Sequence, residues 1–259
     1  MRKIESKHNK TIKWIIKLIN DPKFRKETKY FCAEGKKVIE SLLNSSTVIN
    51  LVVSESYLFK NQKILSKFYD KLLVLPNEVF SQLSTLKTPE GIMGIFENKE
   101  RKIIFDKEKN YLALVDIQNP NNLGAIIRSS LAFDIAGIFL INSHVDLYNQ
   151  DVIRSSSGYV FEMPISYYNN FEYFLSDIKK NNLSLVATAL TSKSIELNKY
   201  KKYKGNCFLI GNEGSGLNEA LISKCEQTIK IVINEKVESL NVANAVSIIA
   251  YYLKSNENN

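Results

Sequence analysis

The chain has 259 residues, enough for one large domain or two smaller ones and enough to bury a hydrophobic core. Hydrophobic residues make up 44% and charged residues 24%, with only 10 glycines and 5 prolines, which excludes collagen-like and disordered proteins. The formal net charge is +8, and no apolar run approaches the roughly 18 residues that a membrane-spanning helix needs.

The basic excess lies entirely in the first part of the sequence. Residues 1–109 contain 22 Lys and Arg against 13 Asp and Glu, a net +9, whereas residues 110–259 contain 13 against 14, a net −1. This uneven distribution favours a first part that binds a polyanion such as a nucleic acid. A lysine-rich surface that only keeps the protein soluble is the alternative.

The three cysteines, Cys32, Cys207 and Cys225, form no CxxC pair and are too few to crosslink a chain of this length. We interpret them as buried hydrophobic residues in a reducing compartment, and we expect no metal site. The basic N-terminal residues are not followed by an apolar segment with a cleavage site, so no secretory signal is predicted. We therefore expect a cytoplasmic protein with no membrane partner.

An amphipathic helix is predicted first, because apolar residues recur at helical spacing over 12–19 while Lys13 and Lys17 fall on other faces. The run Asn20–Pro22 ends this helix. Apolar strands and helical patterns then alternate at 30–33, 38–43, 49–53, 72–75, 79–83 and 92–96, which indicates a small α/β unit. The mostly charged stretch 97–110 is a predicted linker, and a boundary within it gives two domains, residues 1–104 and 105–259.

The alternation of strands and helices resumes after the linker. Strands are predicted at 111–117, 137–141, 183–187, 207–210 and 229–233, and helices at 123–133, 171–179, 218–225 and 242–253. Strands followed by helices of this length are typical of a parallel sheet covered on both faces. The predicted fold class is α/β, with a parallel-sheet domain after a smaller α/β domain.

Three segments place polar or glycine residues directly after predicted strands, where open parallel sheets bind ligands. In the first segment, residues 119–128, Asn122 is a candidate N-cap and Arg128 follows six residues later on the same predicted helix. A helix cap followed by a surface arginine without a function is the alternative interpretation.

The second segment, residues 210–217, has the pattern GxxGxG directly after an apolar strand. Its glycines let the backbone bend sharply and approach a ligand, but the pattern is neither GxGxxG nor GxxxxGK[ST] and gives little support for dinucleotide or nucleoside triphosphate binding. A tight turn before a helix capped by Asn218 is the alternative, although a turn gives no reason for the carboxylate of Glu213.

In the third segment, residues 231–245, a predicted strand leads through a polar loop into a helix, and Ser239 and Asn241 stand where caps occur. Capping alone accounts for these two residues as well as a functional role does. The only histidines are His8 and His144, and no GxSxG occurs, which disfavours a Ser-His-Asp hydrolase.

Taken in order, the three segments resemble the signature of the SpoU (TrmH-like) RNA 2′-O-ribose methyltransferases of the SPOUT superfamily. The family patterns NxGxxxR, LxGxExxG and SLNVxxA begin here at Asn122, Leu209 and Ser239, each after a predicted strand. Upstream, residues 31–38 resemble the FxxEG start of the small ribosomal-protein-like substrate-binding domain often joined to this family. With that start included, the resemblance covers nearly the whole chain.

The resemblance implies a sheet with a deep trefoil knot, which departs from the general rule against knotted chains. It also implies S-adenosylmethionine as cofactor, with its adenosine part held by Thr188, Ala189, Ile210, Gly211, Ile231 and Leu240. The catalytic residues that it implies are Asn122, Arg128, Glu213, Ser239 and Asn241.

Methyl transfer to a ribose hydroxyl requires an in-line approach, a rigidly held cofactor and removal of the hydroxyl proton. A guanidinium is a poor base, so we expect Arg128 to hold a neighbouring phosphate and to stabilise the developing alkoxide. We expect Asn122 to orient the hydroxyl, and Glu213 to orient either Arg128 or a cofactor loop. Many relatives have an aspartate where this chain has Asn119, and we expect little loss because asparagine makes the same turn.

RNA is the implied substrate, with ribosomal RNA favoured. The RNA-contacting candidates are Lys13, Lys17, Lys36 and Lys37 in the basic first part and Arg154 in the second, which could instead belong to a plain helix-to-strand link. The resemblance also implies a homodimer to which the helix at 242–253 contributes. A tRNA 2′-O-methyltransferase and a non-catalytic RNA-binding or ribosome-assembly protein are the alternatives.

Overall fold

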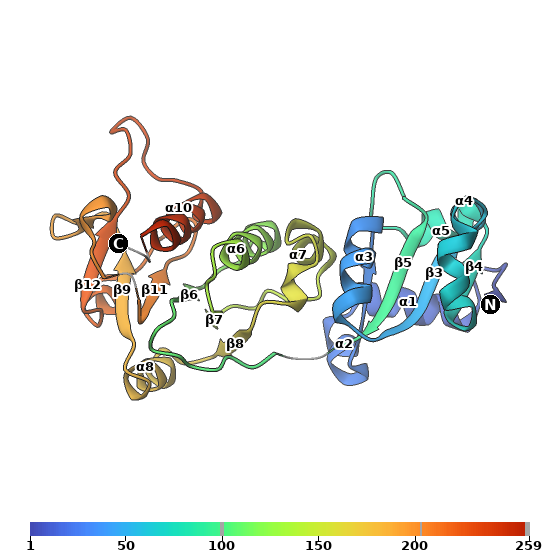
Figure 1. Ribbon diagram of the computed structural model, residues 1–259, viewed down its shortest axis with the longest axis horizontal. Helices are drawn as coiled ribbons and strands as arrows, with labels where there is room; N and C mark the ends of the chain where they lie inside the picture. The colour runs from blue at the N-terminus through green and yellow to red at the C-terminus, as the bar shows by residue number, and fades with distance from the viewer. Residues whose placement is uncertain (99–100, 203, 257–259) are drawn as a thin grey trace. The chain divides into compact units, whose positions relative to one another are not determined.

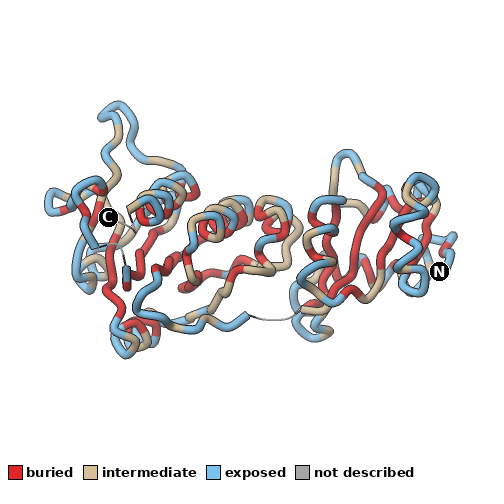
Figure 2. The backbone as a smooth tube through the Cα atoms, in the orientation of Figure 1, coloured by how far each residue is buried: buried red, intermediate tan, exposed pale blue. Residues whose placement is uncertain are grey.

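The computed structural model describes residues 1–98, 101–202 and 204–256, and their contacts divide into two compact units. The first unit combines the chain up to residue 98 with residues 146–161, and the second combines residues 101–145 with residues 162–256. In both units the central strands are buried and the outer faces of the helices are exposed (Figure 2).

The first unit contains a five-stranded mixed sheet in the order β1-β4-β3-β5-β2 (Figure 1). Strands β1, β4 and β3 pair in parallel, whereas β5 runs antiparallel to both β3 and β2. Its elements up to residue 98 are β1 (Arg2–Lys3), α1 (Lys10–Asn20), α2 (Pro22–Thr28), β2 (Tyr30–Glu34), α3 (Lys36–Ser45), β3 (Val48–Ser54), α4 (Glu55–Leu65), η1 (Ser66–Lys71), β4 (Leu72–Leu75), α5 (Asn77–Leu83) and β5 (Ile92–Glu97).

Helix α1 shows how the sequence builds this unit. The side chain of Asn9 accepts a hydrogen bond from the backbone N–H of Thr11 and so caps the helix. The apolar stripe of α1 is buried together with side chains of α5 and of the sheet, which explains the predicted amphipathic pattern. The next helix, α2, begins at Pro22, so the predicted end of α1 is confirmed.

The second unit contains a seven-stranded parallel sheet in the order β10-β12-β9-β11-β6-β7-β8. Helices α6 and α10 pack side by side on one face of the sheet, and α8 covers the other (Figure 1). The elements of residues 101–256, including α7 and η2 of the first unit, are β6 (Tyr111–Val115), α6 (Pro120–Ala132), β7 (Gly137–Ile141), α7 (Gln150–Ser155), η2 (Tyr159–Phe161), β8 (Ile165–Tyr168), α8 (Phe171–Lys180), β9 (Ser184–Thr188), β10 (Ile195–Glu196), η3 (Leu197–Lys199), β11 (Asn206–Ile210), α9 (Glu219–Ile222), β12 (Gln227–Lys230) and α10 (Val242–Ser255).

The α/β class with a parallel sheet is confirmed, but some predicted elements are wrong in extent. The strand predicted at 229–233 is β12 and ends at Lys230, because the apolar residues Ile231 and Ile233 line a cavity instead of continuing the sheet. The helix predicted at 218–225 is only α9, and α4 was not predicted because Leu65 is its one buried residue and leaves no apolar stripe. Residues 99 and 100 of the predicted linker lie outside the described residues.

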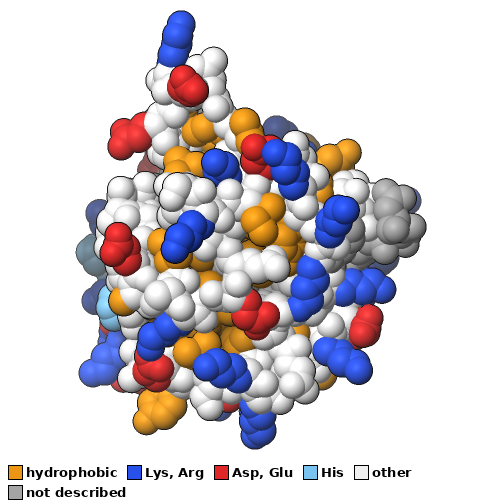
Figure 3. Space-filling view, turned by 90° about the vertical axis from the view of Figure 1, so that its left-hand side faces the viewer, with side chains coloured by type: hydrophobic (Ala, Val, Ile, Leu, Met, Phe, Trp, Pro, Cys, Tyr) orange, Lys and Arg blue, Asp and Glu red, His pale blue; other side chains and the backbone are white. Residues whose placement is uncertain are grey.

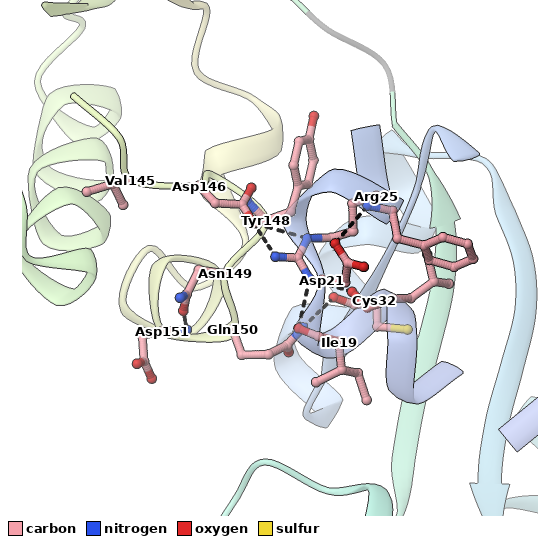
Figure 4. Close-up of polar contacts among 12 residues, drawn as sticks. Ile19, Asp21, Arg25, Cys32, Val145, Asp146, Tyr148, Asn149, Gln150 and Asp151 are labelled. Carbon is pink, nitrogen blue, oxygen red and sulfur yellow. Dashed lines mark hydrogen bonds and ion pairs between the residues drawn. The ribbon is translucent and has the colours of Figure 1, made fainter. Parts of the chain in front are cut away.

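The segment 146–161 packs with the first unit, whereas the predicted domains assigned it to the second (Figure 4). The buried guanidinium of Arg25 donates from Nε to Asp146 at 3.0 Å, pairs with the same carboxylate through Nη2, and donates from Nη1 to the carbonyl of Ile19 at 2.7 Å. The Phe31 ring stacks on Phe161 with 4.2 Å between ring centroids. The contacts of Arg25 with Asp146 and of Phe31 with Phe161 join positions more than 100 residues apart, so sequence periodicity gave no sign of them.

The described helices include none that is long and apolar enough to cross a membrane. The cysteines fit their interpretation as hydrophobic residues, since Cys32 and Cys207 are buried and Cys225 is partly buried. Burial raises the pKa of the Cys32 and Cys225 thiols to about 12, so both stay protonated and unreactive near neutral pH.

We expect Asp146→Asn to lower the free energy of unfolding by about 3 kcal/mol, because the buried Arg25 charge loses its anionic partner. Urea unfolding of the full chain measures this change. The matched control is Asp151→Asn, which breaks the exposed ion pair with Arg154 and should cost less than about 1 kcal/mol. Equal losses in the two variants would contradict a structural role for the buried pair.

Candidate functional site

A cavity of about 540 Å³ opens at the carboxyl edge of the parallel sheet in the second unit. Strands β9 and β11 pair in parallel and end at this edge, and β12 pairs with β9 on the other side. The lining combines apolar strand ends with polar loop residues: Thr188, Ala189, Ile210, Gly211, Glu213, Ile229, Ile231, Ile233, Glu238, Ser239, Leu240 and Val242 are among its residues.

The loop after β11 forms one wall of this cavity and is tightly folded. Asn212 and Gly216 exchange backbone hydrogen bonds of 3.0 and 3.3 Å, which closes the loop on itself. A Cβ atom at Gly211 would lie 2.2 Å from the backbone carbon of Gly216 and 2.6 Å from the nitrogen of Leu217. Glycine is therefore required at position 211 by a backbone contact that no side chain could relieve.

Three of the predicted catalytic side chains form one hydrogen-bonded chain beside this loop. Asn241 donates from Nδ2 to Oδ1 of Asn122 at 3.1 Å, and Asn122 donates from Nδ2 to Oε1 of Glu213 at 3.1 Å. The backbone N–H of Asn119 lies 3.4 Å from the same Glu213 oxygen. This chain joins the segments that follow β6, β11 and β12 at one edge of the sheet.

The six residues predicted to hold the cofactor all line the cavity, and so do Glu213 and Ser239. Arg128 is exposed on α6, and its side chain makes no hydrogen bond or ion pair with the described residues. The predicted interaction between Glu213 and Arg128 is therefore not formed within one chain, where Glu213 instead contacts Asn122 and Asn119.

The prediction that Asn122 caps its helix is wrong. Helix α6 begins at Pro120, and the N-cap is Asn119, whose Oδ1 accepts from the backbone N–H of Asn121 at 2.9 Å. Proline favours the first helical position because its φ angle is already helical and it has no N–H to satisfy. The side chain of Asn122 is thus free to serve the hydrogen-bonded chain.

Sequence reasoning missed Asn212, which holds the loop in place. Its Nδ2 donates to the carbonyl of Asp116 at 2.7 Å, and its Oδ1 accepts from the backbone N–H of Gly214 at 2.9 Å. An asparagine directly after the first glycine of a glycine-rich loop is the signal that could have found it, because this side chain readily bonds the backbone two residues on.

The predicted RNA-contacting side chains are all exposed: Lys13, Lys17, Lys36, Lys37 and Arg154. Lys36 already lies 3.9 Å from Glu40, and Arg154 pairs with Asp151. In the space-filling view onto the second unit, basic side chains are scattered among carboxylates and hydrophobic groups (Figure 3). This face thus carries charged side chains of both signs, as expected from the nearly equal numbers of basic and acidic residues in the second part of the sequence.

Two family models match the chain. The model described as the SpoU rRNA Methylase family matches residues 109–251, which include every residue of the cavity and of the hydrogen-bonded chain named above. The chain belongs to the SpoU rRNA methylase family. The model described as MRM3-like substrate binding domain matches residues 9–94, so the resemblance predicted for both parts of the sequence is confirmed.

Several relatives of this SpoU methylase resemble it along its whole length. The 23S rRNA (guanosine(2553)-2′-O)-methyltransferase RlmP of Bacillus subtilis is 27% identical over 98% of this chain and 100% of its own. The AdoMet-bound rRNA methyltransferase from Sinorhizobium meliloti has a TM-score of 0.85 at 28% identity, covering 98% of this chain and 97% of that one. A solved RNA 2′-O ribose methyltransferase has a TM-score of 0.83 at 26% identity, with 98% of both chains covered.

The cavity of this SpoU methylase fits S-adenosylmethionine. Its volume of about 540 Å³ lies within the roughly 300–1,000 Å³ typical of small-molecule sites. The apolar ends of β11 and β12 suit a purine ring, whereas the carboxylates of Glu213 and Glu238 suit the positive charges of the methionine part. A nucleoside with a cationic tail thus matches both kinds of lining.

We expect Gly211→Ala to weaken binding of S-adenosylmethionine at least about tenfold, because the new methyl group displaces the loop that walls the cavity. Isothermal calorimetry on the purified protein measures the affinity. Gly214→Ala is the matched control, since a Cβ there would meet only Asn212 Oδ1, at 3.6 Å, and binding should change less than about twofold. Unchanged affinity for S-adenosylmethionine in Gly211→Ala would contradict the assignment of this cavity as the cofactor site.

Proposed function

We propose that this protein transfers a methyl group from S-adenosylmethionine to a ribose 2′-hydroxyl of ribosomal RNA. The observation that carries the proposal is the cavity of six predicted cofactor residues lying beside the chain of Asn241, Asn122 and Glu213. Its relative RlmP acts on 23S rRNA, which supports ribosomal RNA as the substrate class.

The residues of the hydrogen-bonded chain position the reacting hydroxyl. When bound, the cofactor supplies a methyl group on a positively charged sulfur. The reaction would join the ribose oxygen to the methyl carbon while the carbon–sulfur bond breaks, and the hydroxyl proton would pass to water. Asn122 has its amide fixed by Glu213 on one side and Asn241 on the other, so its orientation is set before the RNA arrives.

Arg128 is proposed to act on the RNA rather than on its own chain. Its guanidinium is exposed and has no described partner, which leaves all its donors available for a phosphate. A positive charge beside the 2′-oxygen also stabilises the alkoxide that develops as the proton departs. Ser239, at the cavity wall, is proposed to fix the 231–241 loop over the cofactor.

The fold and assembly implied by the resemblance are also proposed for this chain. A trefoil knot is supported by the path of the chain, in which β12 lies between β9 and β10 and α10 then returns to pack on α6. A homodimer is supported by α10, whose outer face exposes Ile248 and Tyr251. We place the site near the subunit interface and the protein in the cytoplasm.

We expect the purified protein to transfer labelled methyl from S-adenosylmethionine to unmodified large-subunit rRNA. Bulk tRNA, assayed in parallel, tests the tRNA alternative, and nuclease mapping locates 2′-O-methylribose. Label in neither pool together with no cofactor binding would support the non-catalytic RNA-binding alternative. Label in tRNA alone would overturn the assignment to ribosomal RNA.

Arg128→Ala should lower turnover more than about 100-fold while cofactor affinity and thermal stability stay unchanged, because the lost charge acts only on bound RNA. Arg128→Lys should recover part of the activity, since lysine keeps the charge but not the bidentate geometry. The control is Lys180→Ala, which removes an exposed charge from α8. Near wild-type turnover in Arg128→Ala would remove Arg128 from the mechanism.

Sedimentation tests the proposed dimer. We expect the wild-type protein to sediment at twice the mass of one chain, and Ile248→Glu to shift it toward the monomer by placing a charge in an apolar interface. Ile104→Glu, which alters an even more exposed isoleucine in another part of the same unit, should leave the dimer intact. A wild-type monomer would contradict the proposed assembly.

A further inference from the structure

The first unit has a cavity of its own, separate from the methyl-transfer site. It measures about 280 Å³ and lies where β3 and β4 end and β5 begins. Sites for drug-sized ligands are typically larger, so this volume suits a single ring system. Its walls are formed by Ser54, Ser56, Tyr57, Lys60, Asn77, Phe80, Ser81, Pro89, Glu90 and Gly91.

The shape of this cavity depends on the approach of Gly91 to Tyr57. Gly91 has a φ of +86°, and a Cβ atom there would lie 2.6 Å from Ser54 Oγ and 2.9 Å from Tyr57 Cβ. Burial and the nearby carboxylates of Glu40 and Glu90 raise the pKa of the Tyr57 hydroxyl. The ring is therefore neutral at physiological pH and presents both an aromatic face and a hydrogen-bond donor.

One wall of the cavity adjoins a residue already predicted to contact RNA. Glu90 accepts a hydrogen bond of 2.6 Å from the backbone N–H of Lys36, at the start of α3. Lys60, on α4, contributes to the same cavity. Lys60 thus lines the cavity, whereas Lys36 is joined to its wall through Glu90.

The surface beside the cavity is basic and aromatic. Lys60, Lys63 and Lys67 are exposed on α4 and η1, and none has an anionic partner among the described residues. The sequence contains no Asp or Glu between residues 56 and 69. The ring of Phe59, next to Lys60 on α4, is 79% exposed.

This combination points to a single-stranded nucleic acid. Unpaired lysines favour a phosphate backbone, and an exposed aromatic ring provides a stacking platform that duplex RNA, with its bases already stacked, cannot use. A protein partner fits less well, because interface cores are depleted in lysine.

We propose that this α4 surface, defined as Phe59, Lys60, Lys63 and Lys67, binds an unpaired segment of the substrate RNA and that one base enters the adjoining cavity. The phosphates then face the lysines, one base stacks on Phe59, and the inserted base contacts Tyr57 and the polar groups of the wall. The inference rests on the proposed function, since it deepens the recognition of RNA by the same protein. It gives the first unit a role in choosing unpaired RNA near the methylated nucleotide.

Fluorescence anisotropy of the full chain tests this proposal. The labelled ligands are 12-nucleotide oligouridylate, 12-nucleotide oligoadenylate and a 12-base-pair RNA duplex. We expect Phe59→Ala to weaken binding of a single strand roughly tenfold and to leave duplex binding within about twofold. Lys60→Ala should lower the slope of log affinity against log salt by about 0.7. RNA carrying 4-thiouridine should form a photocrosslink to Tyr57 or Phe59, located by mass spectrometry.

Tyr173→Ala and Lys180→Ala are the matched controls, because they remove an exposed aromatic ring and an exposed lysine from α8 of the second unit. The inference would be overturned if variants of the α4 surface bound single strands with an affinity within about twofold of these controls. The proposed function would be unaffected by that result. Equal losses for single strands and duplex would overturn base insertion. A wild-type protein that neither binds RNA nor transfers methyl would overturn both proposals together.

Discussion

The parallel pairing of β11 with β6 on one side and β9 on the other is the constraint on which the candidate site depends. Parallel strands bring their carboxyl ends to one edge of a sheet, so the segments that follow them are gathered whatever their separation in sequence. Asn122 and Asn241 are 119 positions apart and still form a hydrogen bond, because α6 and α10 pack side by side on one face of this sheet. The loop at Gly211 can close only because its neighbouring backbone passes where a side chain would otherwise stand.

In the proposed function, the two units carry out two tasks that have opposite electrostatic requirements. A site for a cationic cofactor needs carboxylates such as Glu213 near its cavity, whereas a surface for RNA needs unpaired cations. The sequence distributes charge accordingly, with the whole basic excess before residue 110. The lysines of α4 and η1 lie far from Glu213 in sequence, on the unit that matches the substrate-binding domain.

The segment 146–161 joins the first unit to the later part of the sequence through the buried charge of Arg25. Arg25 is 4% exposed and satisfies its guanidinium with backbone carbonyls of α1 and the carboxylate of Asp146. A buried cation of this kind is stable only when its partners are held in position, so it specifies where the segment packs. The adjoining stack of Phe31 on Phe161 adds apolar contact to this specification.

The sequence by itself determined the α/β class, the family and the order of most strands and helices, because these depend on local periodicity and on short patterns such as that beginning at Leu209. It also predicted six cofactor-binding residues, and the structure gathers all six at one cavity. Only the tertiary structure decided that Glu213 contacts Asn122 and not Arg128, that Asn119 is the cap of α6, and that residues 146–161 pack with the first unit. These features arise from contacts between residues that are distant in the sequence. Local residue patterns do not predict which distant side chain packs against a given residue.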